Sequence, residues 1–208
     1  MTKSIYDQLN AHGTVAKQRF VETFSGDALD TDRWSTAVVG DGTVTMSDSV
    51  DGGIVLNSGS NAVNQTTSIA FDGKRPFSAT GCMFLCVAKL NGTTDQVTYI
   101  GMSNGATGVS GHNMTYQKGL SGSTWLATTY DGSTWAEANS TVTVDTSAHL
   151  FQIEGSASST TFSIDGVVTN VIDSGTPTAA LSPNLQIQNR NSSTARSLNS
   201  SYMECYNT

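Results

Sequence analysis

The chain has 208 residues, of which 13% are charged, and a formal net charge of −7 at pH 7. This length suits one domain, because β-sandwiches of about 200–250 residues often remain undivided. An acidic chain with few charges excludes a sequence-independent grip on nucleic-acid phosphates or on an anionic membrane, since both need clustered basic side chains. No apolar run approaches the ~20 residues of a membrane-spanning helix, and no secretory signal is visible. We therefore expect neither nucleic acid nor membrane as a partner.

The N-terminal residues carry the one helical pattern of the sequence. Capping-box spacing at Ser4 and Asp7 predicts a helix of a few turns, which Gly13 would end. So short a helix is not stable alone, so it must pack on its own domain or on another subunit. We expect an arm over residues 1–18 and a β-sandwich over residues 19–208. The contact side chains of the arm would be its apolar ones, Ile5, Tyr6 and Leu9.

After the arm, apolar and polar residues alternate in short segments between turn signals. Asp165-Gly166 and Asp131-Gly132 are dipeptides that supply the positive φ of tight hairpins. Residues 77–90 are apolar on both faces, which is typical of a central strand buried on both sides. The final strand, over residues 201–206, is expected to pair with the first, over residues 20–24. More than ten such strands predict two stacked antiparallel sheets.

The late strands carry a motif of a known fold family. Residues 149–154 (His-Leu-Phe-Gln-Ile-Glu) and 161–168 (Thr-Phe-Ser-Ile-Asp-Gly-Val-Val) resemble the concanavalin A-like lectin/glucanase (laminin-G-like) jelly rolls. Residues 22–34 are similar to the opening strand and first loop of that family, and residues 202–206 to its last strand. The resemblance implies an all-β, antiparallel two-sheet jelly-roll sandwich. It implies little about function, because this fold hosts lectins, glycosidases, lyases and shell modules.

Glycoside hydrolysis needs two carboxylates about 5–10 Å apart. In the glucanases of this family they come from Glu-x-Asp-x-(x)-Glu on one strand. None of the four glutamates of this chain lies in such a spacing: Glu22, Glu137, Glu154 and Glu204. The residue types of a lyase cluster are present, without a diagnostic spacing, in Tyr116, His112, Gln117 and Arg190. The sequence therefore predicts that the protein is not an enzyme.

Two binding sites are candidates. Asp27, Asp30 and Asp32 cluster in one loop, where they could hold calcium or could simply form a turn; no other cofactor is expected. A sugar site would combine an aromatic platform with hydrogen-bonding side chains. By strand parity Tyr130 and Trp135 share a face across their turn, so the candidate carbohydrate-binding residues are Tyr130, Trp135, Tyr116 and Asp131. The alternative for the aromatic pair is hairpin packing or a subunit contact.

The hydroxyl-rich, low-charge composition, together with this sandwich, also resembles accessory proteins of tailed phages. The prediction is a virion structural protein, a capsid decoration or cement subunit made in the host cytoplasm. It would act as a homo-oligomer by adhesion to other virion proteins, namely the major capsid protein or sister copies. The alternative is a carbohydrate-binding module or tail-fibre receptor-binding domain that binds host surface glycans. An enzyme that degrades polysaccharides is the third reading.

Overall fold

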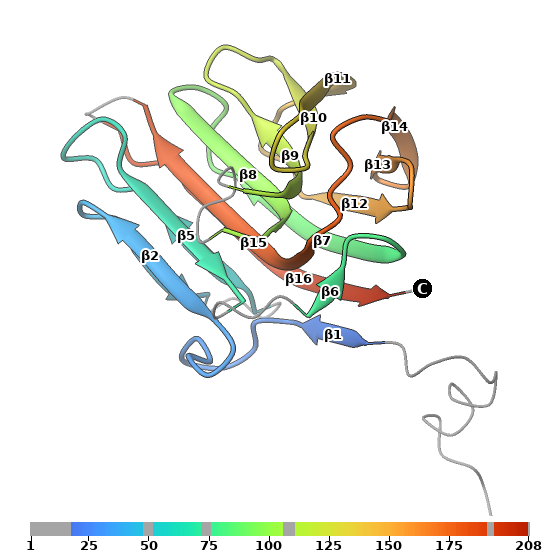
Figure 1. Cartoon of the computed structure of the whole chain (residues 1–208). Helices are drawn as coiled ribbons and strands as arrows, with labels where there is room; N and C mark the ends of the chain where they lie inside the picture. The colour runs from blue at the N-terminus through green and yellow to red at the C-terminus, as the bar shows by residue number, and fades with distance from the viewer. Residues whose placement is uncertain (1–17, 48–51, 72–75, 106–110, 191–193, 208) are drawn as a thin grey trace, which may run out of the picture.

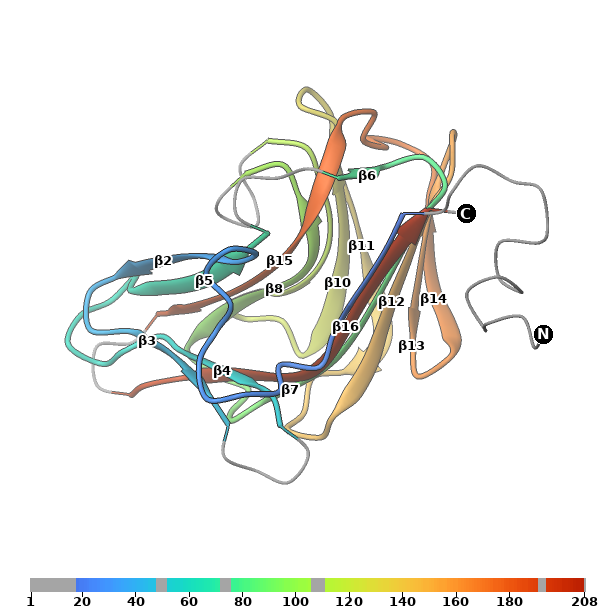
Figure 2. The same ribbon diagram turned by 90° about the horizontal axis from the view of Figure 1, so that it is seen from below.

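The computed structural model describes residues 18–47, 52–71, 76–105, 111–190 and 194–207. These residues form sixteen strands in two eight-stranded antiparallel sheets (Figures 1 and 2). The predicted all-β jelly-roll sandwich is therefore confirmed. Within the described ranges there is no helix, and so none that is long and apolar enough to cross a membrane. The predicted helical arm, with Ile5, Tyr6 and Leu9, lies outside the described residues, and the structure gives it no support.

Sheet A has the strand order β14-β13-β12-β7-β16-β4-β3, with β1 also paired to β16. In chain order its strands are β1 (Arg19–Glu22), β3 (Thr43–Met46), β4 (Ile54–Asn57), β7 (Cys82–Leu90), β12 (His149–Gly155), β13 (Thr160–Ile164), β14 (Val167–Ile172) and β16 (Ser197–Asn207). The pairing of β1 with β16 confirms that the first and last strands are neighbours.

Sheet B has the strand order β11-β10-β9-β8-β15-β5-β2, with β6 also paired to β15. In chain order its strands are β2 (Ser35–Val39), β5 (Thr66–Ala70), β6 (Phe77–Ser78), β8 (Gln96–Ser103), β9 (Asn113–Lys118), β10 (Thr124–Tyr130), β11 (Trp135–Thr143) and β15 (Ala180–Asn189). The sequence predicted one strand where the chain instead passes from β6 in sheet B to β7 in sheet A. Gly81, with φ at 74°, lies at this crossing.

The core lies between the two sheets and is built from alternate residues of each strand. Its aromatic centre is a set of edge-to-face contacts in which Tyr116 meets Phe151 and Phe162, and Trp125 meets Phe151. The three cysteines, Cys82, Cys86 and Cys205, are free thiols on the core side of β7 and β16. Burial raises the pKa of Cys82 to about 11 and that of Cys86 to about 12. These thiols therefore serve as small apolar side chains.

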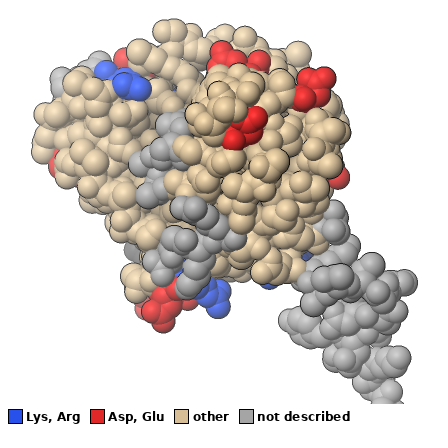
Figure 3. Space-filling model, in the orientation of Figure 1, with Lys and Arg blue, Asp and Glu red and all other residues tan. Residues whose placement is uncertain are grey.

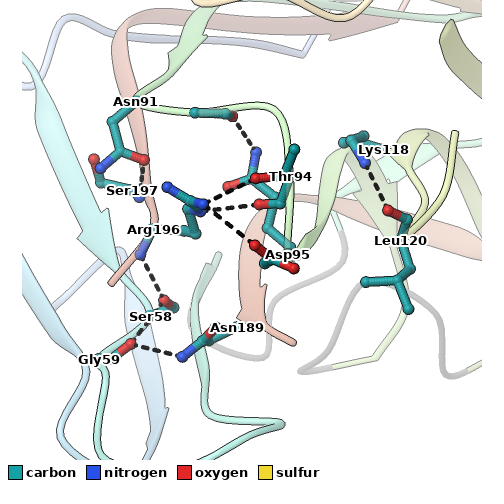
Figure 4. A network of polar contacts seen from close by, with 12 residues as sticks. Ser58, Gly59, Asn91, Thr94, Asp95, Lys118, Leu120, Asn189, Arg196 and Ser197 are labelled. Atoms are coloured by element: carbon teal, nitrogen blue, oxygen red, sulfur yellow. Dashed lines mark hydrogen bonds and ion pairs between the residues drawn. The ribbon is translucent and has the colours of Figure 1, made fainter. Parts of the chain in front are cut away.

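A polar network joins three loops at one end of the sandwich (Figure 4). The Arg196 guanidinium donates to the Thr94 carbonyl at 2.9 Å and to the Thr94 hydroxyl at 3.0 Å, and lies 3.6 Å from the Asp95 carboxylate. The backbone N–H of Arg196 donates to the Ser58 hydroxyl at 3.0 Å. The side chains that join these loops are polar, so hydrogen bonds rather than apolar contacts hold the loops together.

The hairpin between β13 and β14 is the one that the sequence indicated best. Ile164 pairs with Val167 across a two-residue turn, in which Asp165 has φ at 53° and Gly166 has φ at 78°. Positive φ at both positions is the conformation that matches the twist of the flanking strands. The Asp165 carboxylate also accepts the backbone N–H of Leu150 at 2.8 Å. The turn is thereby fastened to the start of β12.

His149 closes the same corner as a clasp between two aspartates. Its Nδ1 lies 2.6 Å from Asp165 Oδ2, and its Nε2 lies 3.1 Å from Asp145 Oδ1. Burial lowers the pKa of His149, but the hydrogen bonds and charges of Asp165 and Asp145 outweigh burial and raise that pKa above its ordinary value. The backbone N–H of Ser147 and the His149 hydrogen bond hold the pKa of Asp145 below its usual value.

The clasp is expected to stabilise the fold more at pH 5.5 than at pH 8.5. A raised pKa in the folded state means that the stability from charged His149 is fully present below its unfolded value near 6.5 and is lost as the pH rises through the folded value. Urea unfolding of the parent chain and of His149→Gln should therefore differ more at the lower pH. Glu154→Gln, which removes an exposed charge from the same strand, serves as the control. An equal effect of His149→Gln at both pH values would contradict the clasp.

Candidate functional site

The outer face of sheet B, opposite the core, carries mainly neutral polar side chains, and we call this face the floor. Its residues alternate with core residues such as Ile100, Met114 and Trp125. Most residues of this outer face are themselves buried: Ser182, Ser103, Asn113, Asn184, Thr115, Thr128, Gln186 and Tyr99. Strand register aligns the outward-facing residues in three rows. One row contains Ser182, Ser103, Asn113, Tyr130 and Trp135. The second contains Asn184, Gly101, Thr115, Thr128 and Glu137. The third contains Gln186, Tyr99, Gln117, Leu126 and Asn139.

The exposed flank of this floor lies on β10 and β11. The rings of Tyr130 and Trp135 are 5.8 Å apart at an interplanar angle of 48°, as a directly opposed pair. Trp135 is 41% exposed, whereas Trp125 is only 2% exposed, so strand parity predicted their faces correctly. The Trp135 indole N–H donates to Glu137 Oε2 at 3.0 Å, which fixes the ring beside a carboxylate. The flank thus offers an apolar surface, a carboxylate and the amide of Asn139.

Asp131, a candidate sugar ligand from the sequence, shapes the turn next to this flank. Its Oδ1 accepts the backbone N–H groups of Thr134 at 2.7 Å and of Ser133 at 2.8 Å, and the Ser133 hydroxyl at 2.8 Å. These hydrogen bonds, Thr134 first, hold the pKa of Asp131 below its ordinary value. Its place in the structure is therefore that of an aspartate that organises a four-residue loop and holds Tyr130 opposite Trp135.

Tyr116 does not belong to this flank, contrary to the grouping made from the sequence. It is fully buried on the core side of β9, where its phenol contacts the Thr169 hydroxyl at 3.1 Å. Burial raises the pKa of the Tyr116 phenol well above its ordinary value. The set of lyase-type residues, Tyr116, His112, Gln117 and Arg190, is also not brought together, because Tyr116 lies on the core side while Gln117 faces outward. The physical reason is register: Tyr116 is opposite Ala127, on the core side, rather than opposite an outward-facing residue of β10.

Several residues of the floor were missed by sequence reasoning. Thr115 and Thr128 share a hydroxyl–hydroxyl contact of 2.7 Å, and the Gln117 amide donates to the Tyr99 phenol at 3.3 Å. Other buried polar atoms have no hydrogen-bond partner: both side-chain atoms of Asn184, the Ser182 hydroxyl and Asn113 Oδ1. The sequence signal was the alternation of polar with apolar residues over 113–117 in β9 and 184–188 in β15. It indicated a polar outer face but not that these residues are adjacent.

The aspartates of the first loop form a turn. Asp30 accepts the backbone N–H of Asp32 at 3.0 Å through Oδ1, and its Oδ2 lies 3.1 Å from the Arg33 guanidinium. No group of three or more His, Cys, Asp or Glu side chains that could hold a metal is present in the described parts of the chain. The calcium site suggested for Asp27, Asp30 and Asp32 therefore has no support from the geometry.

The fold matches solved structures of glucanases. A β-1,3-glucanase from Mycobacterium marinum superposes with a TM-score of 0.69 at 13% identity, over 89% of this chain and 97% of the other. A β-glucanase from Bacillus licheniformis gives 0.67 at 14% identity, over 91% and 98%. A glycoside hydrolase family 16 endo-glucanase from Bacteroides ovatus gives 0.67 at 14%, over 88% and 98%. Neither a family model nor a curated protein matches the sequence. The chain therefore has the concanavalin A-like jelly-roll fold of these enzymes.

The comparisons correct the functional prediction made from the sequence. The three solved structures described above are glucanases, and none of them is a virion protein. They contradict the predicted capsid decoration subunit, and with it the prediction that the protein is not an enzyme. Both predictions depended on the spacing of the glutamates and on the composition, and neither feature describes the shape of the folded surface.

Proposed function

We propose that this protein acts on a neutral polysaccharide of the glucan type, which it holds on the outer face of sheet B over β10 and β11. The observation that carries the proposal is the contact of half-buried Tyr130 with exposed Trp135, whose indole is hydrogen-bonded to Glu137. An aromatic surface of this kind suits the apolar face of a pyranose ring, while carboxylate and amide groups suit its hydroxyls. The same fold in glucanases supports the substrate class.

The charge of the floor supports a neutral chain over an acidic one. Glu137 is the only carboxylate in the described strands of sheet B, and Lys118 is their only basic residue. Lys118 is buried, and its ammonium donates to the carbonyls of Gly119 and Leu120. The face seen in Figure 3 shows few charged side chains. Without an accessible basic side chain on these strands, an anionic polysaccharide has no counter-charge there.

Glu137 is the acid that this site would use on a bound glycan. Glycoside hydrolysis by two carboxylates needs a partner about 5–10 Å away. The strands of sheet B do not supply that partner within the described residues, so it would have to come from a loop. Asp131 lies in the loop of the same hairpin, four residues before Trp135, the first residue of β11. Its turn hydrogen bonds hold it in place as a carboxylate.

Trp135→Ala is expected to weaken binding of a soluble β-glucan by roughly tenfold or more, because aromatic anchors carry most of the energy of such contacts. Affinity electrophoresis and calorimetry measure this on the full chain. Val167→Ala, which truncates an exposed apolar side chain on β14 of sheet A, is the control and should bind like the parent. Release of reducing ends, compared between the parent and Glu137→Gln, reports separately on turnover. Unchanged glucan affinity in a folded Trp135→Ala protein would overturn the proposal.

A further inference from the structure

The outer face of sheet A, opposite the core, differs from the floor of sheet B because it carries large apolar and aromatic side chains. On β7 and β16 the core residues, such as Phe84 and Cys205, alternate with outward-facing ones. These outward-facing residues are half-buried: Met83, Leu85, Val87, Tyr202 and Tyr206. Val21 of β1 and the pair Val168 and Val171 of β14 extend this face on its two sides and are exposed. A contiguous apolar face of this kind is typical of an interaction surface.

Two charged residues of this face lie in one row across the strands. Strand register aligns four outward-facing residues, one each from β12, β7, β16 and β1: Glu154, Met83, Tyr206 and Arg19. Glu154 is exposed, and the Arg19 side chain is 55% exposed although its Nε donates to Glu204 at 2.7 Å. Glu204 also accepts the Tyr202 phenol at 2.5 Å, so its charge is satisfied within one copy of the chain. A guanidinium has four N–H groups besides Nε, so Arg19 can bind a second carboxylate.

This row is complementary to itself. The strand order β12-β7-β16-β1 has its midpoint between β7 and β16. A two-fold axis parallel to the strands through this midpoint places β12 of one copy over β1 of a second copy, and β7 over β16. Glu154 then faces Arg19 of the second copy, and the symmetry forms this ion pair twice. In the same row Met83 faces Tyr206 of the second copy, so an apolar contact lies between the two ion pairs.

We propose that the outer face of sheet A is the interface of a two-fold symmetric homodimer, in which two sandwiches pack back to back. Enrichment in tyrosine, methionine and arginine is typical of the core of a protein interface. Four columns of strands about 4.8 Å apart and four outward-facing residues about 6.7 Å apart give roughly 500 Å² from each copy; the columns are β12, β7, β16, and β1 followed by β4. The total of about 1,000 Å² is the lower limit for a specific interface, so we expect a micromolar dissociation constant.

Sedimentation equilibrium of the full chain tests the dimer. The average mass should rise from that of one chain at about 1 μM to nearly twice that value at several hundred μM, as a dissociation constant of about 10 μM requires. Val21→Arg adds a charge that each copy would bury in the interface, so it should raise the dissociation constant at least about tenfold. Val38→Arg is the matched control, because it makes the same change on sheet B at a valine that is 43% exposed, against 41% for Val21.

A charge reversal at Glu154 tests the symmetry of the dimer. Glu154→Arg places like charges opposite each other at both ends of the interface, so it should raise the dissociation constant about a hundredfold. Asp173→Arg makes the same reversal in the loop whose Ser174 carbonyl binds Thr129 of β10, and should dimerise like the parent. Far-ultraviolet circular dichroism checks that each variant is folded. A monomer at every concentration, which would leave the face to another partner, or a dimer that Val21→Arg and Glu154→Arg both leave intact, would overturn the proposal.

Discussion

Replacing Trp34 by alanine is expected to lower the free energy of unfolding by about 3–5 kcal/mol. Trp34 is 1% exposed and lies at the centre of an aromatic cluster. Its ring centroid is 5.7 Å from that of Phe20, 5.6 Å from that of Phe24 and 5.7 Å from that of Phe71. The indole N–H donates to Glu22 Oε2 at 3.3 Å, and the other oxygen of that carboxylate accepts the Phe24 backbone N–H at 2.9 Å.

The loss at Trp34 has two parts. Truncation removes the apolar contact that joins β1, β2 and the residue after β5, and it leaves a cavity that the rigid strands cannot close. It also takes a hydrogen bond away from Glu22. Because domains of this size are stable by only about 5–15 kcal/mol, such a loss is a large fraction of the total.

Trp135→Ala is the matched control for Trp34→Ala, since it makes the same truncation at a residue that is 41% exposed. We expect urea unfolding, followed by far-ultraviolet circular dichroism, to show a change of no more than about 1 kcal/mol there. Trp34→Phe should recover most of the loss, as it keeps the ring contacts and gives up only the indole hydrogen bond. A Trp34→Ala protein as stable as Trp135→Ala would show that the cluster does not hold this end of the sandwich.

The architecture was predictable because its strongest signals are local. Asp165-Gly166 separates two segments in which apolar and polar residues alternate, and the structure has the two-residue turn that this spacing predicts. Asp131-Gly132 marked a real hairpin, although its loop spans four residues, because Tyr130 rather than a later residue pairs with Trp135. Turn chemistry thus determined where the chain reverses. It did not determine how many residues each reversal uses.

Register between distant strands could not be obtained from the sequence. The first and last strands do pair, but Glu204 is opposite Val21, while Phe20 is opposite Cys205 on the core side. A shift of one residue reverses every side chain of a strand, so the pairing alone says little about which groups meet. For the same reason the sequence analysis grouped Tyr116 with residues of the wrong face. Its face depends on the pairing of β9 with β10, and the length of the loop between them could not be predicted. Tyr130 and Trp135 were placed correctly because one short turn connects them.

The proposed glucan face illustrates this limit. The glucan face is assembled from neighbouring strands, so its aromatic pair was visible in the sequence while its amide and hydroxyl floor was not. The bulge in β16, between the segment that pairs with β4 and the segment that pairs with β1, shows the same limit. No local pattern reports such a bulge, because the extra residue, Ser201, is ordinary for an exposed strand.

Gly155→Ala is expected to destabilise the protein by about 3 kcal/mol, the upper end for overpacking in a closed site. Gly155 ends β12, pairs with Thr160, and accepts the Gly81 backbone N–H at 2.8 Å. A Cβ atom built there would lie 2.0 Å from the Ala79 carbonyl oxygen and 3.1 Å from Cys82 Sγ. Both neighbours are fully buried. Since the first contact is with backbone, no rotation of a flexible side chain relieves it.

Gly122→Ala separates this steric effect from the general effect of removing a glycine. The nearest atom to a Cβ at Gly122 is the Thr124 carbonyl oxygen at 3.5 Å, an ordinary contact, and neither glycine has a left-handed backbone conformation. The control should therefore be neutral or stabilising by about 0.4–1 kcal/mol, because alanine restricts the unfolded chain. Urea unfolding of the two variants side by side measures the difference. Equal stability would mean that the crossing from β6 to β7 can shift away from β12, and that the tight approach at Ala79 is not needed to hold the two sheets together.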